Sequence, residues 1–159
     1  MEPTIRAPRS DEAEALAELH LRTWEQTYGG VFPPSAWGAG ARAARIRQWT
    51  ALCGTPGADW RTAVAEIGGR PVGIAHTEHD LAEHAPRQRV LAFIYLLADV
   101  QGSGAGQALL DEVLADEPAS LWVLEENPRA RAFYARNGFA PSGERRPTGL
   151  GGHEIRMLR

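Results

Sequence analysis

Gln101-Gly102-Ser103-Gly104-Ala105-Gly106 is the most informative stretch of this sequence. It follows an apolar run over residues 90–97 and precedes residues 108–114, whose pattern is helical. A strand that leads through a glycine-rich turn into a helix is a common phosphate-binding arrangement. Glycines let the backbone approach an anion, and the first turn of the helix offers unpaired N–H groups at the positive end of its dipole. The stretch therefore predicts a phosphate-binding turn, with a turn that binds no ligand as the alternative.

Two well-known phosphate-binding loops do not fit these residues. A Walker A loop requires a lysine after its last glycine, whereas Gln107 follows Gly106 and all 17 basic residues are arginine. A dinucleotide-binding loop requires Gly-x-Gly-x-x-Gly, and Gln107 again takes the place of the third glycine. A third pattern, Gln/Arg-x-x-Gly-x-Gly/Ala, fits Gln101, Gly104 and Gly106 without adjustment. It resembles the coenzyme A pyrophosphate loop of the GNAT superfamily of N-acetyltransferases.

Length and composition predict one soluble globular domain over residues 1–159. Apolar residues make up 43% and charged residues 23% of the chain, and scattered arginines with a net charge of −3 argue against nucleic-acid binding. Cys53 is the only cysteine, which excludes an internal disulfide and a cysteine metal cluster. The sequence has neither a long apolar segment nor a signal peptide. We therefore expect a cytoplasmic protein without a membrane partner.

Periodicity predicts an α/β protein with a mixed (α+β) sheet. Strands are predicted in the segments of alternating or continuous apolar residues, which are 4–7, 62–67, 70–75, 90–97, 120–124, 139–145 and 154–158. Helices are predicted where apolar residues recur every three or four positions, which are 11–24, 41–52, 108–117 and 128–137. Ser10 or Asp11 should cap the first helix, Gly68-Gly69 should form a hairpin turn, and residues 53–59 should form a loop. The apolar run 90–97 should be a central strand of the sheet.

A second pattern lies in residues 121–139. A strand is followed by Asn127, then Ala130 three residues on, then Phe133-Tyr134, and finally Gly138-Phe139 after the helix. This segment resembles the other hallmark of the GNAT superfamily, and the two hallmarks occur in the expected order. The resemblance covers nearly the whole chain. It implies the GNAT acyl-CoA N-acyltransferase fold, in which helices flank a central mixed sheet with splayed strands.

The resemblance also implies an activity. Such a protein transfers an acetyl group from acetyl-CoA, as cosubstrate, to a primary amine of a small molecule or peptide. The alternative is a non-catalytic acyl-CoA-binding sensor or scaffold of the same fold. By this resemblance the coenzyme A-binding residues are Ile94, Tyr95, Leu96, Gln101, Gly102, Ser103, Gly104, Ala105, Gly106, Gln107, Asn127 and Tyr134.

The resemblance assigns two catalytic groups. The Leu96 N–H would stabilise the oxyanion, and Tyr134 would protonate the leaving thiolate. Many relatives carry a glutamate as general base on the central strand or on the next one, where this chain has Val90 and Trp122. Two alternatives therefore remain open. Either the amine arrives neutral and needs no base, or one of five residues acts as the base, which are Glu25, Glu78, His79, Asp80 and Glu125.

The acceptor site is predicted from aromatic and acidic residues. Trp24, Tyr28, Glu78 and Glu125 fall where the family binds its acceptor, and their side chains suit a cationic amine. The segment 24–30 is similar to relatives that acetylate polyamines or other small amines, while protein N-termini and antibiotic amines remain alternatives. We expect no metal, because the His, Asp and Glu residues of 78–84 match no standard ligand spacing. Family members often pair through edge strands, which leaves a homodimer open.

Overall fold

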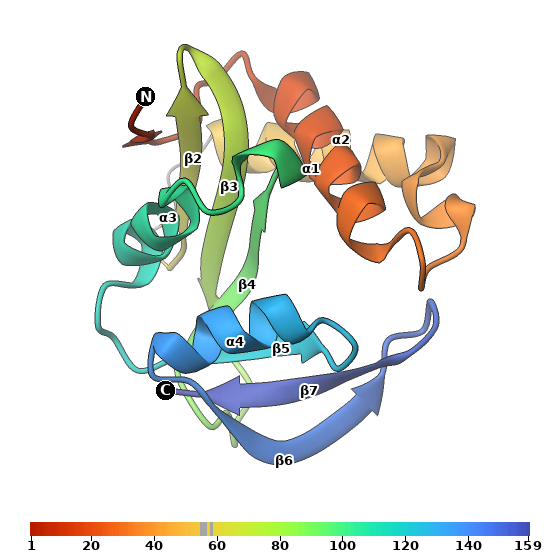
Figure 1. Cartoon of the computed structure of the whole chain (residues 1–159), viewed down its shortest axis with the longest axis vertical. Coiled ribbons are helices and arrows are strands. Elements are labelled where there is room, and N and C mark those ends of the chain that lie inside the picture. The colour runs from red at the N-terminus through yellow and green to blue at the C-terminus, as the bar shows by residue number, and fades with distance from the viewer. Residues whose placement is uncertain (55–56, 58) are drawn as a thin grey trace.

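A single mixed sheet of seven strands, in the order β1-β2-β3-β4-β5-β7-β6, forms the centre of the computed structural model (Figure 1). The structure describes residues 1–54, 57 and 59–159. The elements follow one another along the chain as β1 (Thr4–Arg6), α1 (Ala13–Tyr28), η1 (Pro34–Trp37), α2 (Ala39–Gly54), β2 (Arg61–Ile67), β3 (Arg70–His79), β4 (Arg89–Leu96), η2 (Ala98–Val100), α3 (Ala105–Leu114), β5 (Ser120–Leu124), α4 (Pro128–Arg136), β6 (Ala140–Pro147) and β7 (His153–Leu158). The predicted mixed α/β fold is confirmed.

Two antiparallel parts of the sheet meet at β4 and β5. Strands β1 to β4 pair in chain order, whereas β7 lies between β5 and β6. The structure gives the parallel pair of β4 and β5 one register position, Val90 opposite Ser120. Beyond it the two strands diverge (Figure 1). The predicted central place of β4 and the predicted splay of the central strands are therefore both confirmed.

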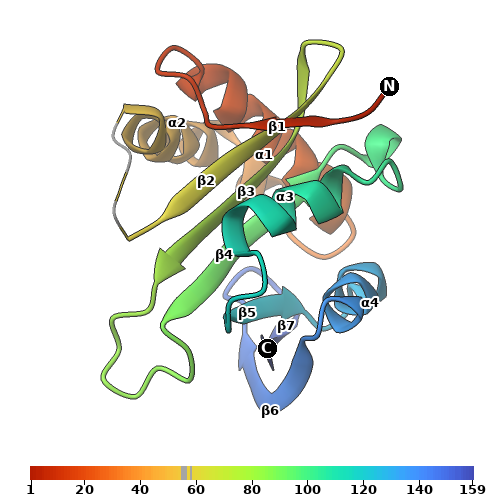
Figure 2. The same cartoon turned by 90° about the vertical axis from the view of Figure 1, so that its left-hand side faces the viewer.

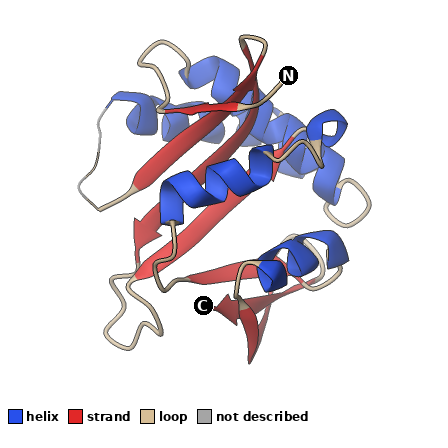
Figure 3. Ribbon diagram, turned by 60° about the vertical axis from the view of Figure 1, so that its left-hand side comes forward, coloured by secondary structure: helices blue, strands red, loops and turns tan. Residues whose placement is uncertain are grey.

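Helices cover both faces of this sheet. In Figure 2, α3 lies in front of β2, β3 and β4, and α1 and α2 lie behind them. Helix α4 lies over β5 and β7 (Figure 3). Leu16 of α1, Trp49 of α2, Ile74 of β3 and Leu109 of α3 are fully buried between these layers. Burying each such side chain stabilises the fold by ~1.5–3 kcal/mol relative to exposure.

The hairpin between β2 and β3 has the predicted two-residue turn. Gly68 and Gly69 have φ angles of 59° and 79°, so both lie in the left-handed region that favours glycine. Two successive residues with positive φ match the twist of the flanking strands. Ile67 pairs directly with Arg70 across the turn.

Several helix boundaries differ from the sequence prediction, since α1 ends at Tyr28 and not at residue 24, and α3 covers Ala105–Leu114 and not residues 108–117. Helix α2 begins before and ends after the predicted segment 41–52, and residues 55, 56 and 58 of the predicted loop 53–59 lie outside the described residues. The predicted cap of α1 by Ser10 or Asp11 is wrong, because Glu12 occupies the N-cap position and its side chain caps no helix amide. No helix in the described part of the chain is long and apolar enough to cross a membrane.

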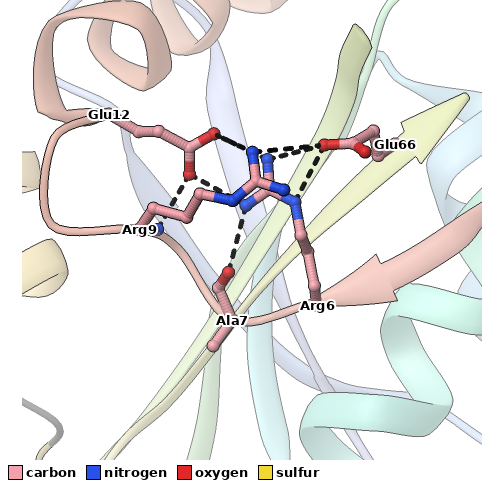
Figure 4. Close-up of polar contacts among 5 residues, drawn as sticks. All are labelled: Arg6, Ala7, Arg9, Glu12 and Glu66. Carbon is pink, nitrogen blue, oxygen red and sulfur yellow. Dashed lines mark hydrogen bonds and ion pairs between the residues drawn. The ribbon is translucent and has the colours of Figure 1, made fainter. Parts of the chain in front are cut away.

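The Glu12 carboxylate is occupied by an ion-pair network that joins β1, β2 and the start of α1 (Figure 4). Arg6 Nη2 lies 2.6 Å from Glu12 Oε1, and Arg6 Nε donates to Glu66 Oε2 at 2.8 Å. The Arg9 N–H also donates to Glu12, at 2.8 Å. The Arg6 guanidinium lowers the pKa of Glu12 by stabilising the carboxylate form. The network therefore anchors the edge strand β1 to the first helix.

A bulge in β4 helps to set the direction of its side chains. The pairing with β3 changes from His76 opposite Phe93 to Thr77 opposite Leu91, so Ala92 is the extra residue. A bulge bends its strand and increases the local twist. Past the bulge, the Phe93 ring lies against helices α1 and α2, with its centroid 4.7 Å from that of His20 in α1. The next residues alternate, as strand geometry requires.

Candidate active site

A cavity of about 530 Å³ opens where β4 and β5 diverge. Its walls are the end of α1, strands β4 and β5, the glycine loop with the first turn of α3, and α4. We call it the central cavity. The predicted site residues that line it are Tyr28, Ile94, Tyr95, Leu96, Gln101, Gly102, Gly104, Gly106, Gln107, Asn127 and Tyr134. The predicted site residues that do not line it are Trp24, Glu78, Ser103, Ala105 and Glu125.

Four residues of the glycine loop offer free amides at the cavity wall. The N–H groups of Gly102, Gly104, Gly106 and Gln107 have no hydrogen-bond partner within the described residues. The last two belong to the first turn of α3, where N–H groups lack an intrahelical acceptor. The positive end of the helix dipole adds to their attraction for an anion. The loop therefore has the donors that a phosphate group requires.

The two remaining residues of the loop hold the turn together. Ser103 N–H donates to the carbonyl of Val100 at 3.2 Å. Ala105 N–H donates to Ser103 Oγ at 3.3 Å, and the Ala105 side chain is fully buried. The structure thus separates the predicted coenzyme A-binding amides into four that are available and two that are used within the turn.

Glycine is required in the loop for two reasons. Gly102 and Gly104 both have a φ of 88°, which L side chains rarely adopt. Gly106 instead allows close packing, because a Cβ there would lie 3.1 Å from Leu96 Cδ1. The start of α3 therefore lies directly against the end of β4, and the loop amides come close to the backbone of that strand.

The backbone of β4 presents polar groups to the gap beside β5. Leu97 N–H donates to the Val72 carbonyl at 2.9 Å, so these residues form a hydrogen-bonded pair. Such pairs alternate with non-hydrogen-bonded pairs along an antiparallel ladder. Leu96 and Ile94 therefore direct their N–H and C=O groups away from β3 and toward the gap. Tyr95, between them, directs its backbone to β3 and contributes its side chain to the cavity.

Tyr134 of α4 lies on the opposite wall of the cavity. Its side chain is 8% exposed, and its hydroxyl forms no hydrogen bond with any residue that the structure describes. Burial raises the pKa of Tyr134, and the nearby Tyr95 adds to the shift. The phenol is therefore protonated at neutral pH and has its proton available. The neighbouring Phe133 also lines the cavity, so both rings of the Phe-Tyr pair contribute to the site.

Asn127 is placed between β5 and α4 as the sequence predicts. Its Oδ1 accepts a hydrogen bond from Ala130 N–H at 3.1 Å, and Pro128 takes the first helical position. This N-cap fixes the start of α4 and therefore the position of Tyr134. Asn127 also lines the cavity, but its contact with a ligand stays a prediction.

The hydroxyls of Tyr28 in α1 and Tyr95 in β4 form a pair. Tyr28 Oη and Tyr95 Oη are 3.1 Å apart, and both residues line the cavity. Burial raises the pKa of each of these phenols, so both keep their protons at neutral pH. Trp24 packs behind the pair, with its ring centroid 5.6 Å from that of Tyr28. Arg45 of α2 places its guanidinium carbon 4.8 Å from the centre of the Trp24 ring.

His20 belongs to the packing behind this wall. It is 2% exposed, and its Nδ1 accepts a hydrogen bond from Trp49 Nε1 at 3.2 Å. Burial lowers the pKa of His20 to about 3, with a smaller contribution from the charge of Arg45. His20 is therefore neutral near pH 7 and does not line the cavity.

The two predicted acidic residues of the acceptor site lie elsewhere. Glu78 is opposite Val90, at the far end of β4 from Leu96, roughly 20 Å away along the strand. Glu125 Oε2 accepts a hydrogen bond from Arg145 Nε at 2.9 Å. No group of three or more His, Cys, Asp and Glu side chains within the described residues could hold a metal ion.

Several cavity residues were not predicted from the sequence. Arg129, Phe133 and Arg136 of α4 line the cavity at spacings of four and three residues, which place them on one face of the helix. Their spacing could have indicated a shared face, but not that this face borders the cavity.

Trp122 also lines the cavity, from β5. Its ring lies 3.9 Å from the guanidinium carbon of Arg146 and 4.7 Å from that of Arg156. These are cation–π distances. The position at which the family pattern places a glutamate is thus occupied by an indole held between two arginines.

Comparison with known proteins identifies the class to which this fold and cavity belong. Residues 58–141 match the family described as the Acetyltransferase (GNAT) domain. The chain therefore belongs to the GNAT family of N-acetyltransferases, which makes it an acetyltransferase of this superfamily. The family recognised from residues 101–106 and 121–139 is confirmed.

Individual relatives agree with this assignment. A probable N-acetyltransferase of Mycobacterium tuberculosis is 28% identical over 151 residues, which span 87% of this chain and 80% of that protein. A structure described as histone acetyltransferase HPA2 and related acetyltransferase from Corynebacterium glutamicum has a TM-score of 0.74 at 22% identity, covering 99% of this chain and 96% of that chain. The PaiA N-acetyltransferase of Thermoplasma acidophilum, solved in complex with coenzyme A, has a TM-score of 0.69 at 19% identity and covers 100% and 99% of the two chains. The two structural likenesses concern the fold.

Proposed function

We propose that this protein transfers an acetyl group from acetyl-CoA to a primary amine of a small molecule or peptide. The observation that carries the proposal is the continuity of the central cavity, which extends from the glycine loop to the tyrosine pair of α1 and β4. One end offers phosphate-binding amides, and the other end offers space beside aromatic side chains. A donor and an acceptor therefore fit in the same cavity.

The donor fits the loop end of the cavity. The free amides of Gly102, Gly104, Gly106 and Gln107 would hold the pyrophosphate. Coenzyme A carries one phosphate besides its pyrophosphate. Arg129 and Arg136, which line the cavity from α4, would supply positive charge for that phosphate. The relative solved with coenzyme A has the same fold, which supports coenzyme A as the ligand of this cavity.

The chain has the groups that activate a thioester. Acetyl-CoA supplies an acetyl group already activated by its bond to sulfur. The backbone of Ile94 would pair with the pantetheine arm, and the Leu96 N–H would donate to the carbonyl oxygen as negative charge develops there. Loss of one such donor in other acyl-transfer sites costs ~2.7–4 kcal/mol.

Tyr134 would move a proton between the two reacting partners. As the C–N bond forms and the C–S bond breaks, the amine nitrogen becomes positive and the sulfur becomes negative. Because burial raises the pKa of Tyr134, donation to a thiolate is unfavourable unless the phenolate is reprotonated. The new ammonium supplies that proton, so Tyr134 would give its proton to sulfur and receive one from nitrogen. No net charge then remains in the cavity.

Release of free thiol from acetyl-CoA across a panel of amines tests this proposal. We expect amine-dependent release by the parent protein and strongly reduced release by Tyr134→Phe, with unchanged affinity for coenzyme A. Binding of acetyl-CoA without amine-dependent release would instead support an acyl-CoA sensor or scaffold.

A further inference from the structure

The acceptor end of the central cavity is aromatic. Tyr28, Phe93, Tyr95 and Trp122 line it. Tyr95 is two residues past Phe93 in β4, so both rings face α1 and α2. Leu124 packs with residues of the α1–η1 region, and Trp122 lies two residues before it in β5, on the same face. We call these four side chains the acceptor wall.

No carboxylate lines the cavity among the residues that the structure describes. The charged side chains that line the cavity, among the residues described, are Arg129 and Arg136 of α4. Arg45 lies against Trp24, directly behind the tyrosine pair, and no carboxylate of the described residues contributes to its pKa. Its hydrogen-bond partner is Gln48 Oε1, 2.9 Å from Nη1. The lining therefore offers no carboxylate to balance the charge of a protonated amine.

Two carboxylates near the acceptor wall are paired with arginines. Glu154 lies close enough to contribute to the raised pKa of Tyr28, but its Oε1 is 2.6 Å from Arg146 Nε. Glu144 Oε2 lies 3.2 Å from Arg156 Nη1. These are the arginines that flank Trp122. These two carboxylates thus balance the arginines of β6 and β7 and are not available to hold a cationic substrate.

An amine that enters this cavity is favoured in its neutral form, which is also the form that attacks a thioester. An α-amino group has a pKa of about 7.7–8.0, whereas an alkyl amine such as that of lysine has a pKa of about 10.4. At pH 7 the neutral fractions are about 10% and about 0.04%, which differ by about 300-fold. At pH 7 the neutral fractions alone therefore favour an α-amino group by this ratio, before nucleophilicity or any direct contact is counted.

The tyrosine pair supplies a second reason to expect an α-amino group as the acceptor. Two hydroxyls that share one hydrogen bond use one of their two protons, so one proton is left to donate. A substrate carbonyl next to the amine could accept it, while a phenolic oxygen accepts an amine N–H. An α-amino acyl group carries its amine and its carbonyl one carbon apart, which matches this pair of partners.

We propose that the acceptor is an α-amino acyl group, the amine of an amino-acid amide or of a peptide N-terminus, rather than an alkyl amine of the polyamine type. The proposal rests on the acetyl transfer proposed above. It makes Tyr28 a residue that determines acceptor specificity, through its hydroxyl.

A comparison of L-phenylalaninamide with phenethylamine tests this inference, with spermidine as the polyamine probe. The first two probes share the ring and the primary amine, but phenethylamine lacks the carboxamide. At pH 7 we expect kcat/KM for phenylalaninamide to exceed that for phenethylamine and for spermidine by at least about 100-fold, from the neutral fractions. At pH 10.5 the ratio to phenethylamine should fall to within about tenfold, because both amines are then largely neutral.

Tyr28→Phe tests the contact with the carbonyl. It should lower the ratio of kcat/KM for phenylalaninamide to kcat/KM for phenethylamine by about 3–10-fold, the usual effect of one hydrogen bond. Equal or faster acetylation of phenethylamine or spermidine at pH 7 would overturn the inference and leave the acetyl transfer in place. Failure to acetylate any of the three amines at any pH would overturn the proposed function itself.

Discussion

Gly104→Glu is the sharpest single test of the phosphate-binding loop. Gly104 is the N-cap of α3, with a φ of 88° and open space where a Cβ would project. The glutamate would therefore be accommodated without a clash, but in a backbone region that costs ~1–2 kcal/mol for a residue with a side chain. That cost should lower Tm by roughly 2–8 °C in a protein of this size.

The effect on coenzyme A should be larger and of electrostatic origin. A carboxylate about 5 Å from a phosphate oxygen repels it by about 1–3 kcal/mol for effective dielectric constants between water and a protein surface. That repulsion alone corresponds to an affinity about 5–150-fold weaker. The new side chain also occupies space in front of the free loop amides, so the larger value is the one we expect.

Gly143→Glu is the matched control. Gly143 has a φ of 91°, open space at its Cβ position and a place in the exposed strand β6. Both variants should therefore lose similar stability, while Gly104→Glu alone loses affinity for coenzyme A in a calorimetric titration. Equal dissociation constants for the two variants would refute phosphate binding by the loop.

Three further predictions follow from the site and the fold. Tyr134→Phe should lower kcat by about 10²–10⁴-fold with little change in Kd for coenzyme A; unchanged kcat in single-turnover experiments would return Tyr134 to a packing role. The neutral amine is the reactive form, so log(kcat/KM) for an alkyl amine should climb with pH well past 8, with an apparent pKa that follows the pKa of the amine, also in Glu125→Gln. Because burial raises the pKa of Tyr134, ionisation of Tyr134 should cause no loss of activity up to about pH 10; a fixed rise near pH 6–7 that Glu125→Gln abolishes would reveal a dedicated base. Glu12→Gln should lower the free energy of unfolding at pH 7 by about 1.5–3 kcal/mol, whereas the exposed Glu14→Gln should change it by less than about 0.5 kcal/mol. The pKa of Glu12 is lowered in the folded state, so its contribution is present above the unfolded pKa and lost as pH falls through the folded value; denaturation curves of parent and Glu12→Gln that stay equally far apart in acid would contradict this reason.

Local patterns carried most of the sequence-based prediction of the fold. Gly68-Gly69 and Asn127-Pro128 were located correctly because turns and helix caps depend on the chemistry of adjacent residues. The central place of β4 followed from its continuous apolar run. The cap of α1 was missed because Glu12 binds Arg6, which also binds Glu66, and Glu66 is distant in the sequence.

Long-range pairing set the limits of prediction at the site. The carboxylates expected near the acceptor were chosen by residue type, but Glu125 is bound by Arg145, twenty positions away, and Glu78 lies at the far end of its strand. Insertion of β7 between β5 and β6 brings Arg156 to Trp122, and sequence spacing does not encode that order. The family resemblance located Leu96 and Tyr134, whose catalytic roles stay predictions.

The most direct measurement is the stoichiometry of the reaction with acetyl-CoA and L-phenylalaninamide. Free thiol and acetylated amide are quantified in the same reaction, the first with a thiol reagent and the second by mass spectrometry. Transfer within one cavity predicts one acetylated amide for each thiol released, and no thiol release without the amine. Thiol release without acetylated product, or tight binding of acetyl-CoA with neither product, would contradict acetyl transfer as the function of this protein.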